Sequence, residues 1–142
     1  MELVVDLPKE IPNFSKMSKA AIKYFLNMSS EQLVNDIKDF TPRRDNDLFE
    51  AWTPLLSNME LRVRNNKEYA RYVEEGTGLY GPNHRRIEAK GSSPMHADIG
   101  GEIIFFWSHK GFEGRHMAEK GLEKFRARIP ILAAEAMIRT SK

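Results

Sequence analysis

Two stretches of helical apolar spacing, one near each end of the chain, constrain the fold most strongly. The first runs from Met17 to Phe40, where Ser15 or Ser18 can cap the start. Its apolar positions are Ile22, Leu26, Leu33, Ile37 and Phe40. The second runs from about His116 to Thr140 and contains Pro130, at which we expect the helix to bend. Its stripe is Ala118, Leu122, Phe125, Ile129, Leu132 and Ala136. Each stretch therefore needs something to pack against.

The first helical stretch has two readings. Ser29 and Gln32 have the spacing of a capping box, which would start a second helix after a break. We favour one helix, with any kink placed at this point. Thr41-Pro42 forces an extended backbone and ends the helix, and Arg43 to Asp47 follows as a polar loop.

Strand patterns supply the other half of the fold. Leu3 to Val5 is a short apolar strand that prolines soon close. Leu48 to Val63 reads as two strands with a turn near Ser57-Asn58, because Met59, Leu61 and Val63 alternate with charged residues. The run Ile103 to Trp107, IIFFW, is apolar enough to be buried on both faces at the centre of a sheet. The sequence thus predicts an α+β fold, a small and mainly antiparallel sheet packed with an N-terminal helix and a long C-terminal amphipathic helix.

The region between these patterns is short on regular structure. Lys67 to Glu75 has the spacing of a short helix with Tyr69, Tyr72 and Val73 on one side, and Gly76 suits a left-handed helix end. Thr77 to Gly101 is rich in glycine and reads as a long loop with a weak strand at about His84 to Ala89. Loops of that length in compact domains are usually functional or mobile.

Composition sets the class of protein. A chain of 142 residues with 41% hydrophobic residues suits a single domain over residues 1–142. The 22 basic and 20 acidic residues nearly cancel, so the net charge of +2 gives no field on the scale of nucleic-acid binding. The chain contains no cysteine, which excludes disulfides, thiolate zinc sites and thiol nucleophiles and fits a reducing compartment. We expect neither a signal peptide nor a membrane span, and hence no membrane partner.

The possible cofactor and metal motifs of the chain lack the flanking elements or the ligand spacing that such sites require. GTGLYG, Gly76 to Gly81, matches G-x-G-x-x-G, but a dinucleotide loop needs a strand before it and a helix after it. A tyrosine-rich helix precedes it here and Pro82 follows, so a flexible turn is the better interpretation. The histidines have no zincin spacing, and His96 with Asp98 falls short of the three or four ligands of a metal site. We therefore expect no cofactor and no metal. The four histidines are His84, His96, His109 and His116.

No catalytic set emerges either. Glu74 and Glu75 are adjacent on a helix and point apart, whereas acid and base catalysis needs two carboxylates that face one pocket. A G-x-S-x-G motif is absent. Three basic clusters could touch phosphate groups, although acidic neighbours weaken each one. They are Arg43-Arg44, His84-Arg85-Arg86 with Lys90, and Arg126 with Arg128. A nucleic-acid-binding accessory protein, and a small hydrolase or metal enzyme, stay as alternatives to a structural protein.

One signature favours the structural protein among these classes. Tyr69 to Gly76, YARYVEEG, follows Asn65 or Asn66 and matches the pattern Tyr-Ala-x-x-Val-Glu-x-Gly. The chain thereby resembles the tail-completion or neck (head–tail joining) proteins of long-tailed bacteriophages over residues 17 to 140. The remaining matches are Thr41-Pro42, Asp45 to Leu48, Trp52, Ile87 to Lys90, Ile103 to Trp107, His109-Lys110-Gly111, and Met117 with Gly121-Leu122. Three places depart from the family. His-Lys-Gly replaces the commoner His-Pro-Gly, Asp-Asn-Asp replaces a Thr-Gly turn, and the loop from Gly91 to Gly101 is longer or more polar than in the family.

The resemblance implies a non-enzymatic structural virion protein that joins or completes the tail as a ring. The implied partners are copies of itself, neighbouring neck or tail-tube proteins, and phage DNA passing through the lumen. The implied locations are the host cytoplasm during assembly and then the head–tail junction. For the assembly interface we expect Tyr69, Tyr72 and Glu74 at one contact. The Thr77 to Gly101 loop, with Arg85, Arg86 and Lys90, would serve another. The rival is that Tyr72 and Val73 simply fill the core.

Overall fold

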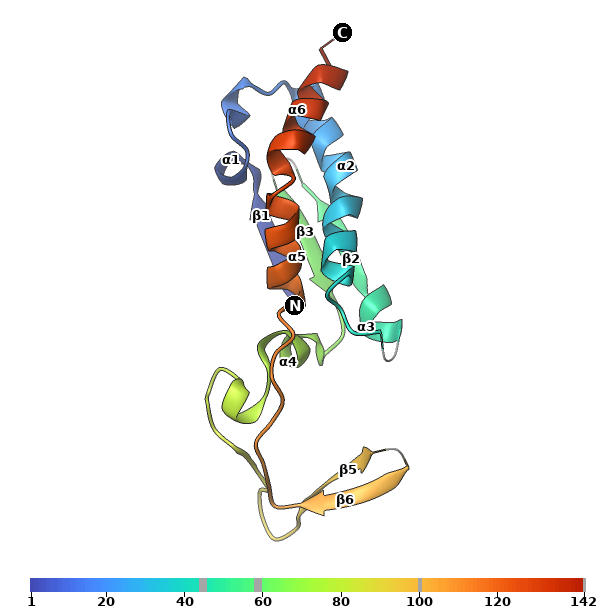
Figure 1. Cartoon of the computed structure of the whole chain (residues 1–142), viewed down its shortest axis with the longest axis vertical. Coiled ribbons are helices and arrows are strands. Elements are labelled where there is room, and N and C mark those ends of the chain that lie inside the picture. The colour runs from blue at the N-terminus through green and yellow to red at the C-terminus, as the bar shows by residue number, and fades with distance from the viewer. Residues whose placement is uncertain (44–45, 58–59, 100, 142) are drawn as a thin grey trace. The chain divides into compact units, whose positions relative to one another are not determined.

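The computed structural model describes residues 1–43, 46–57, 60–99 and 101–141 (Figure 1). It divides into two compact units, the first made of Met1–Ala70 with His116–Lys142 and the second of Arg71–Arg115. A single domain over the whole chain stays a prediction. In the described residues, no helix is both long and apolar enough to cross a membrane.

The first unit contains a three-stranded antiparallel sheet in the order β1 (Glu2–Asp6), β3 (Glu60–Asn65), β2 (Trp52–Leu56). The predicted strands at Leu3 to Val5 and on both sides of Ser57 are confirmed, while Asn58 and Met59 lie outside the described residues. Leu61 and Val63 are fully buried, so β3 alternates as expected.

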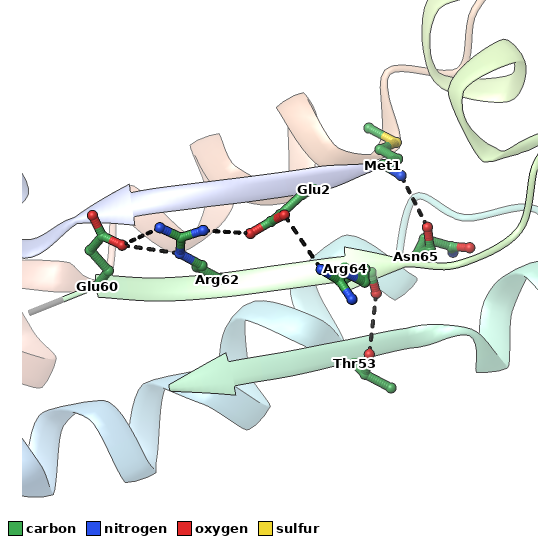
Figure 2. Close-up of polar contacts among 7 residues, drawn as sticks. All are labelled: Met1, Glu2, Thr53, Glu60, Arg62, Arg64 and Asn65. Atoms are coloured by element: carbon green, nitrogen blue, oxygen red, sulfur yellow. Dashed lines mark hydrogen bonds and ion pairs between the residues drawn. The ribbon is translucent and has the colours of Figure 1, made fainter. Parts of the chain in front are cut away.

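The other face of the sheet carries charged side chains (Figure 2). Arg62 on β3 bonds Glu60 at 2.7 Å and Glu2 on β1 at 3.0 Å. The hydrogen bonds that Arg62 donates, above all to Glu60 and then to Glu2, raise the pKa of its guanidinium. Arg64 lies 3.9 Å from the second oxygen of Glu2, and its carbonyl accepts from the Thr53 hydroxyl at 3.4 Å. Side chains thus link all three strands on this face.

Helices cover the buried face of the sheet (Figure 1). The longest, α2, spans Lys19–Lys38 without a break, so one helix is confirmed and a second start at Ser29 is wrong. Ser18 caps it by accepting a bond from the Ala21 amide at 3.1 Å. Short elements flank it: α1 (Leu7–Glu10), the 3₁₀ turn η1 (Phe14–Lys16) and α3 (Asn46–Glu50). The strand expected from Leu48 is therefore wrong in its first residues, because Leu48 is the buried residue of α3.

The C-terminal stretch forms two consecutive helices, α5 (Met117–Arg126) and α6 (Ile129–Arg139). Pro130 lies in the first turn of α6, where its missing amide hydrogen costs no helical bond. The chain therefore starts a new helix where the sequence predicted a bend within one. The buried side of the pair includes Ala118, Leu122, Phe125, Ile129 and Ala136, as the stripe predicted.

The second unit consists of short elements. They are most of α4 (Ala70–Glu75), the 3₁₀ turn η2 (Gly78–Tyr80), β4 (Ile87–Glu88), β5 (Met95–Ile99), β6 (Glu102–Phe106) and β7 (Ser108–His109). The predicted short helix is confirmed but begins at Ala70, and Gly76 follows it in the expected left-handed conformation, with φ of 89°. Two antiparallel pairs form, β4 with β7 and β5 with β6. The segment expected as a loop thus contains strand β5 as well as the weak strand β4.

The predicted role of the IIFFW run is wrong. A strand forms there, but β6 pairs with β5 in a two-stranded hairpin, which has no central strand. Ile103 is 61% exposed, Phe105 66% and Trp107 58%. An apolar run fits a strand that a partner molecule covers as well as it fits a central strand, and the pattern alone does not distinguish them.

Candidate assembly surface

Two segments that lie far apart in the sequence cross in the second unit. The Thr77 amide donates to the Phe112 carbonyl at 2.9 Å, and the Phe112 amide donates to the Thr77 hydroxyl at 2.9 Å. Next to them the Leu79 amide donates to the Lys110 carbonyl at 2.8 Å. Gly111 has φ of 93°, and a Cβ atom there would overlap the Thr77 carbonyl. The glycine of the His-Lys-Gly turn is therefore required by this backbone crossing.

A cavity of about 530 Å³ opens beside the crossing. Side chains of α4 and of the segment before β4 line it, including Arg71, Tyr72, Arg85 and Arg86. Arg71 is neutralised by Glu75, whose carboxylate lies 3.1 Å from its Nε.

Arg85 and Arg86, unlike Arg71, are not paired with a carboxylate among the described residues. Arg86 donates to the neutral Ser108 hydroxyl at 2.7 Å. Two unneutralised guanidinium groups beside a cavity favour an anionic group within it.

The residues expected at the interface are distributed unequally. Tyr72, Arg85 and Arg86 meet at the cavity, and Lys90 lies exposed beyond β4. Tyr72 is 63% exposed, so the rival reading in which it fills the core is wrong. Glu74 is buried, and Tyr69 precedes α4 in the first unit with 38% of its surface exposed. The interface roles of all six residues stay predictions.

Sequence reasoning missed the apolar residues of this surface. It assigned Ile103, Phe105 and Trp107 to the core, and it overlooked Phe112, which is 69% exposed. A signal for the hairpin was available, because two glycines separate the strand patterns Met95 to Ile99 and Glu102 to Phe106. The Asp98 carboxylate accepts a bond from the Gly101 amide at 3.0 Å and so fixes the turn. No pattern in the sequence indicates that the strand is exposed.

His109 and the glycine string of the second unit are the residues here that the sequence raised for metal or cofactor binding. The described residues contain no group of three or more histidine, aspartate or glutamate side chains placed to hold a metal. The His109 ring lies 5.5 Å from the ring of Phe106 and 5.1 Å from that of Phe112, and its Nδ1 accepts from the Gly111 amide. The glycine string Gly76 to Gly81 follows helix α4 and contains η2, so it lacks the strand that a dinucleotide loop requires.

Comparison with protein families gives a match over half of the chain. A family model described as "Bacteriophage HK97-gp10, putative tail-component" matches residues 6–76. No curated protein and no solved structure matches the chain. The matched residues include helix α2, sheet strands β2 and β3, and the Tyr-Ala-x-x-Val-Glu-x-Gly signature.

Proposed function

Because the chain belongs to the HK97-gp10-like family of bacteriophage tail components, we propose that it joins or completes the tail at the head–tail junction. It is a structural tail protein. In the proposal it acts without enzymatic activity and assembles as a ring of copies. A ring with cyclic symmetry uses two different surfaces of each subunit, one for each neighbour.

One observation carries the proposal beyond the family. The second unit exposes several large apolar side chains, most of them between Ile103 and Phe112. They include Tyr72, Ile103, Ile104, Phe105, Trp107 and Phe112. Monomeric proteins rarely expose large contiguous apolar surface, and such surface usually marks contact with another protein. A subunit that becomes buried in a virion removes this surface from water, which is a favourable contribution to assembly.

The proposed partners follow from the position in the particle. Copies of the chain form the ring, and neighbouring neck or tail-tube proteins contact its two ends. Phage DNA passes through the lumen. Assembly takes place in the host cytoplasm, after which the protein stays in the virion.

Deletion of the gene from the phage that encodes it tests the role. We expect electron microscopy to show filled heads and separate tails, and we expect the plaque titre to fall. Expression of the chain from a plasmid should restore the titre. Lys120, an exposed residue of α5, supplies a control, because Lys120→Ala should restore the titre fully. Intact infectious virions from the deleted phage would refute the proposal.

A nucleic-acid-binding accessory role is the second candidate, and the free charges of Arg85 and Arg86 favour it. It predicts that the full chain binds duplex DNA with an affinity that falls steeply as salt increases. The variant with both Arg85→Ala and Arg86→Ala should then lose binding, whereas Arg64→Ala, which removes an exposed arginine of the first unit, should retain it.

A further inference from the structure

The β5–β6 hairpin carries apolar side chains on both faces. Residues directly opposite each other in an antiparallel pair share a face. Ile104 faces the same way as its partner Ala97, and Phe105 faces the same way as His96. Ile104 is 44% exposed and Phe105 66%. A two-stranded hairpin is marginally stable in water by itself, so this one needs a cover.

The turn end of the β5–β6 hairpin and the region beside β4, from which the hairpin extends, differ in charge. The hairpin sequence from Met95 to Phe106 contains Asp98 and Glu102 and no lysine or arginine. Both acidic residues are exposed and lie at the turn end. At the other end, beside β4, lies the cavity with Arg85 and Arg86. The second unit thus has an acidic and apolar surface at the turn end of the hairpin and a basic cavity beside β4.

The β4–β7 pair continues into the hairpin, because the Ala89 amide donates to the Trp107 carbonyl at 2.8 Å. From there β5 and β6 extend for five residues each, about 17 Å of strand. Figure 1 shows them as a separate pair of arrows at the end of the segment.

We propose that the hairpin tip of one copy docks at the cavity of a second copy. Glu102, at the turn end of β6, then meets Arg85 and Arg86, and apolar side chains of the hairpin are covered around this contact. The contact joins two different surfaces, so it repeats from copy to copy and closes where the rotation allows. This inference rests on the proposed ring and identifies the surfaces that build it.

A charge exchange tests the contact. Glu102 is the better site, because Asp98 also holds the turn. Glu102→Arg alone and Arg85→Glu alone each place like charges together, and each should lower the titre of the complemented deletion phage at least about tenfold. The chain that carries both changes restores opposite charges between copies and should regain most of the titre.

The absence of cysteine allows a second measurement in the assembled particle. Because the chain has no cysteine of its own, disulfides between copies can form only through an introduced pair. A chain with Glu102→Cys and Arg85→Cys should give, in oxidised virions, a ladder of linked multimers that stops at the ring size. Glu102→Cys combined with Lys120→Cys is the control and should give no ladder.

The outcomes separate this inference from the proposed function. If the chain is required for head–tail joining but the exchange gives no rescue and the cysteines give no ladder, the docking is refuted and the function stands. If Arg85→Glu removes salt-dependent DNA binding and Glu102→Arg does not rescue the titre, DNA occupies the cavity and the docking is again refuted. Virions that form without the chain would refute both.

Discussion

Single buried polar residues account for parts of the family signature. Asn65 is fully buried at the end of β3, where its side-chain amide donates to the Leu48 carbonyl at 3.0 Å. Its side-chain oxygen accepts from the Lys67 amide at 3.1 Å. Asn66 is exposed, so the structure selects Asn65 as the asparagine that precedes the signature. It ties the end of β3 to α3.

Asn65→Ala is therefore predicted to destabilise the protein by about 2–3 kcal/mol, because one buried and one partly buried backbone group lose their partners. Urea unfolding of the purified chain, followed by circular dichroism, measures the loss. Asn66→Ala is the matched control and should stay within about 0.5 kcal/mol of the parent. Equal effects of the two changes would contradict the assignment.

Thr41 explains the Thr-Pro segment in the same way. Its hydroxyl donates to the Ile37 carbonyl at 2.9 Å and accepts from the Trp52 ring nitrogen at 3.0 Å. Thr41→Val keeps the shape and removes both bonds, so we predict a loss of about 1–3 kcal/mol in the same unfolding assay. A change of Thr53 to valine, at an exposed position of β2, should cost far less.

At the level of elements, helices α2 and α5 approach closely at Gly121. A Cβ atom on Gly121 would lie 2.5 Å from the Cα of Ile37 and 2.6 Å from its Cγ1. Glycine in a helix interior costs about 1 kcal/mol relative to alanine, so its presence here is explained by the packing. The Gly-Leu pair of the signature thus places one helix directly on another.

Gly121→Ala should destabilise the chain by about 1–3 kcal/mol, although alanine favours helix, because the added carbon forces the helices apart. Lys120→Ala at the neighbouring exposed position serves as the control. A rise in the urea midpoint for Gly121→Ala would show that helix propensity outweighs this packing.

Elements with one solvent-exposed face could be predicted from the sequence. The apolar residues of helix α2 recur with the helical period, and those of strand β3 alternate with polar residues. Most of the buried positions of both elements could therefore be read from the pattern. Phe40 was expected in the core and is 39% exposed, because α2 ends at Lys38. Strand β6 and the start of α6 were misread for a related reason. An apolar run and a proline each fit two environments, and only the packing around them decides.

At the scale of the molecule, stability and assembly are predicted to separate. Phe105 is exposed, so Phe105→Ser should leave the free energy of unfolding within about 0.5 kcal/mol. The proposed docking would lose an apolar contact, and incorporation into particles, measured by quantitative mass spectrometry of purified virions, should fall. Ile131→Ser on α6, at a position 70% exposed, is the matched control. Equal losses for both would point to solubility as the cause.

Cryo-electron microscopy of purified virions would show the proposed assembly itself. We expect a closed ring of this chain at the head–tail junction, with the β5–β6 hairpin of each copy seated at the Arg85 and Arg86 cavity of its neighbour. Absence of the chain from the junction, or its presence there as a single copy, would refute the proposed ring.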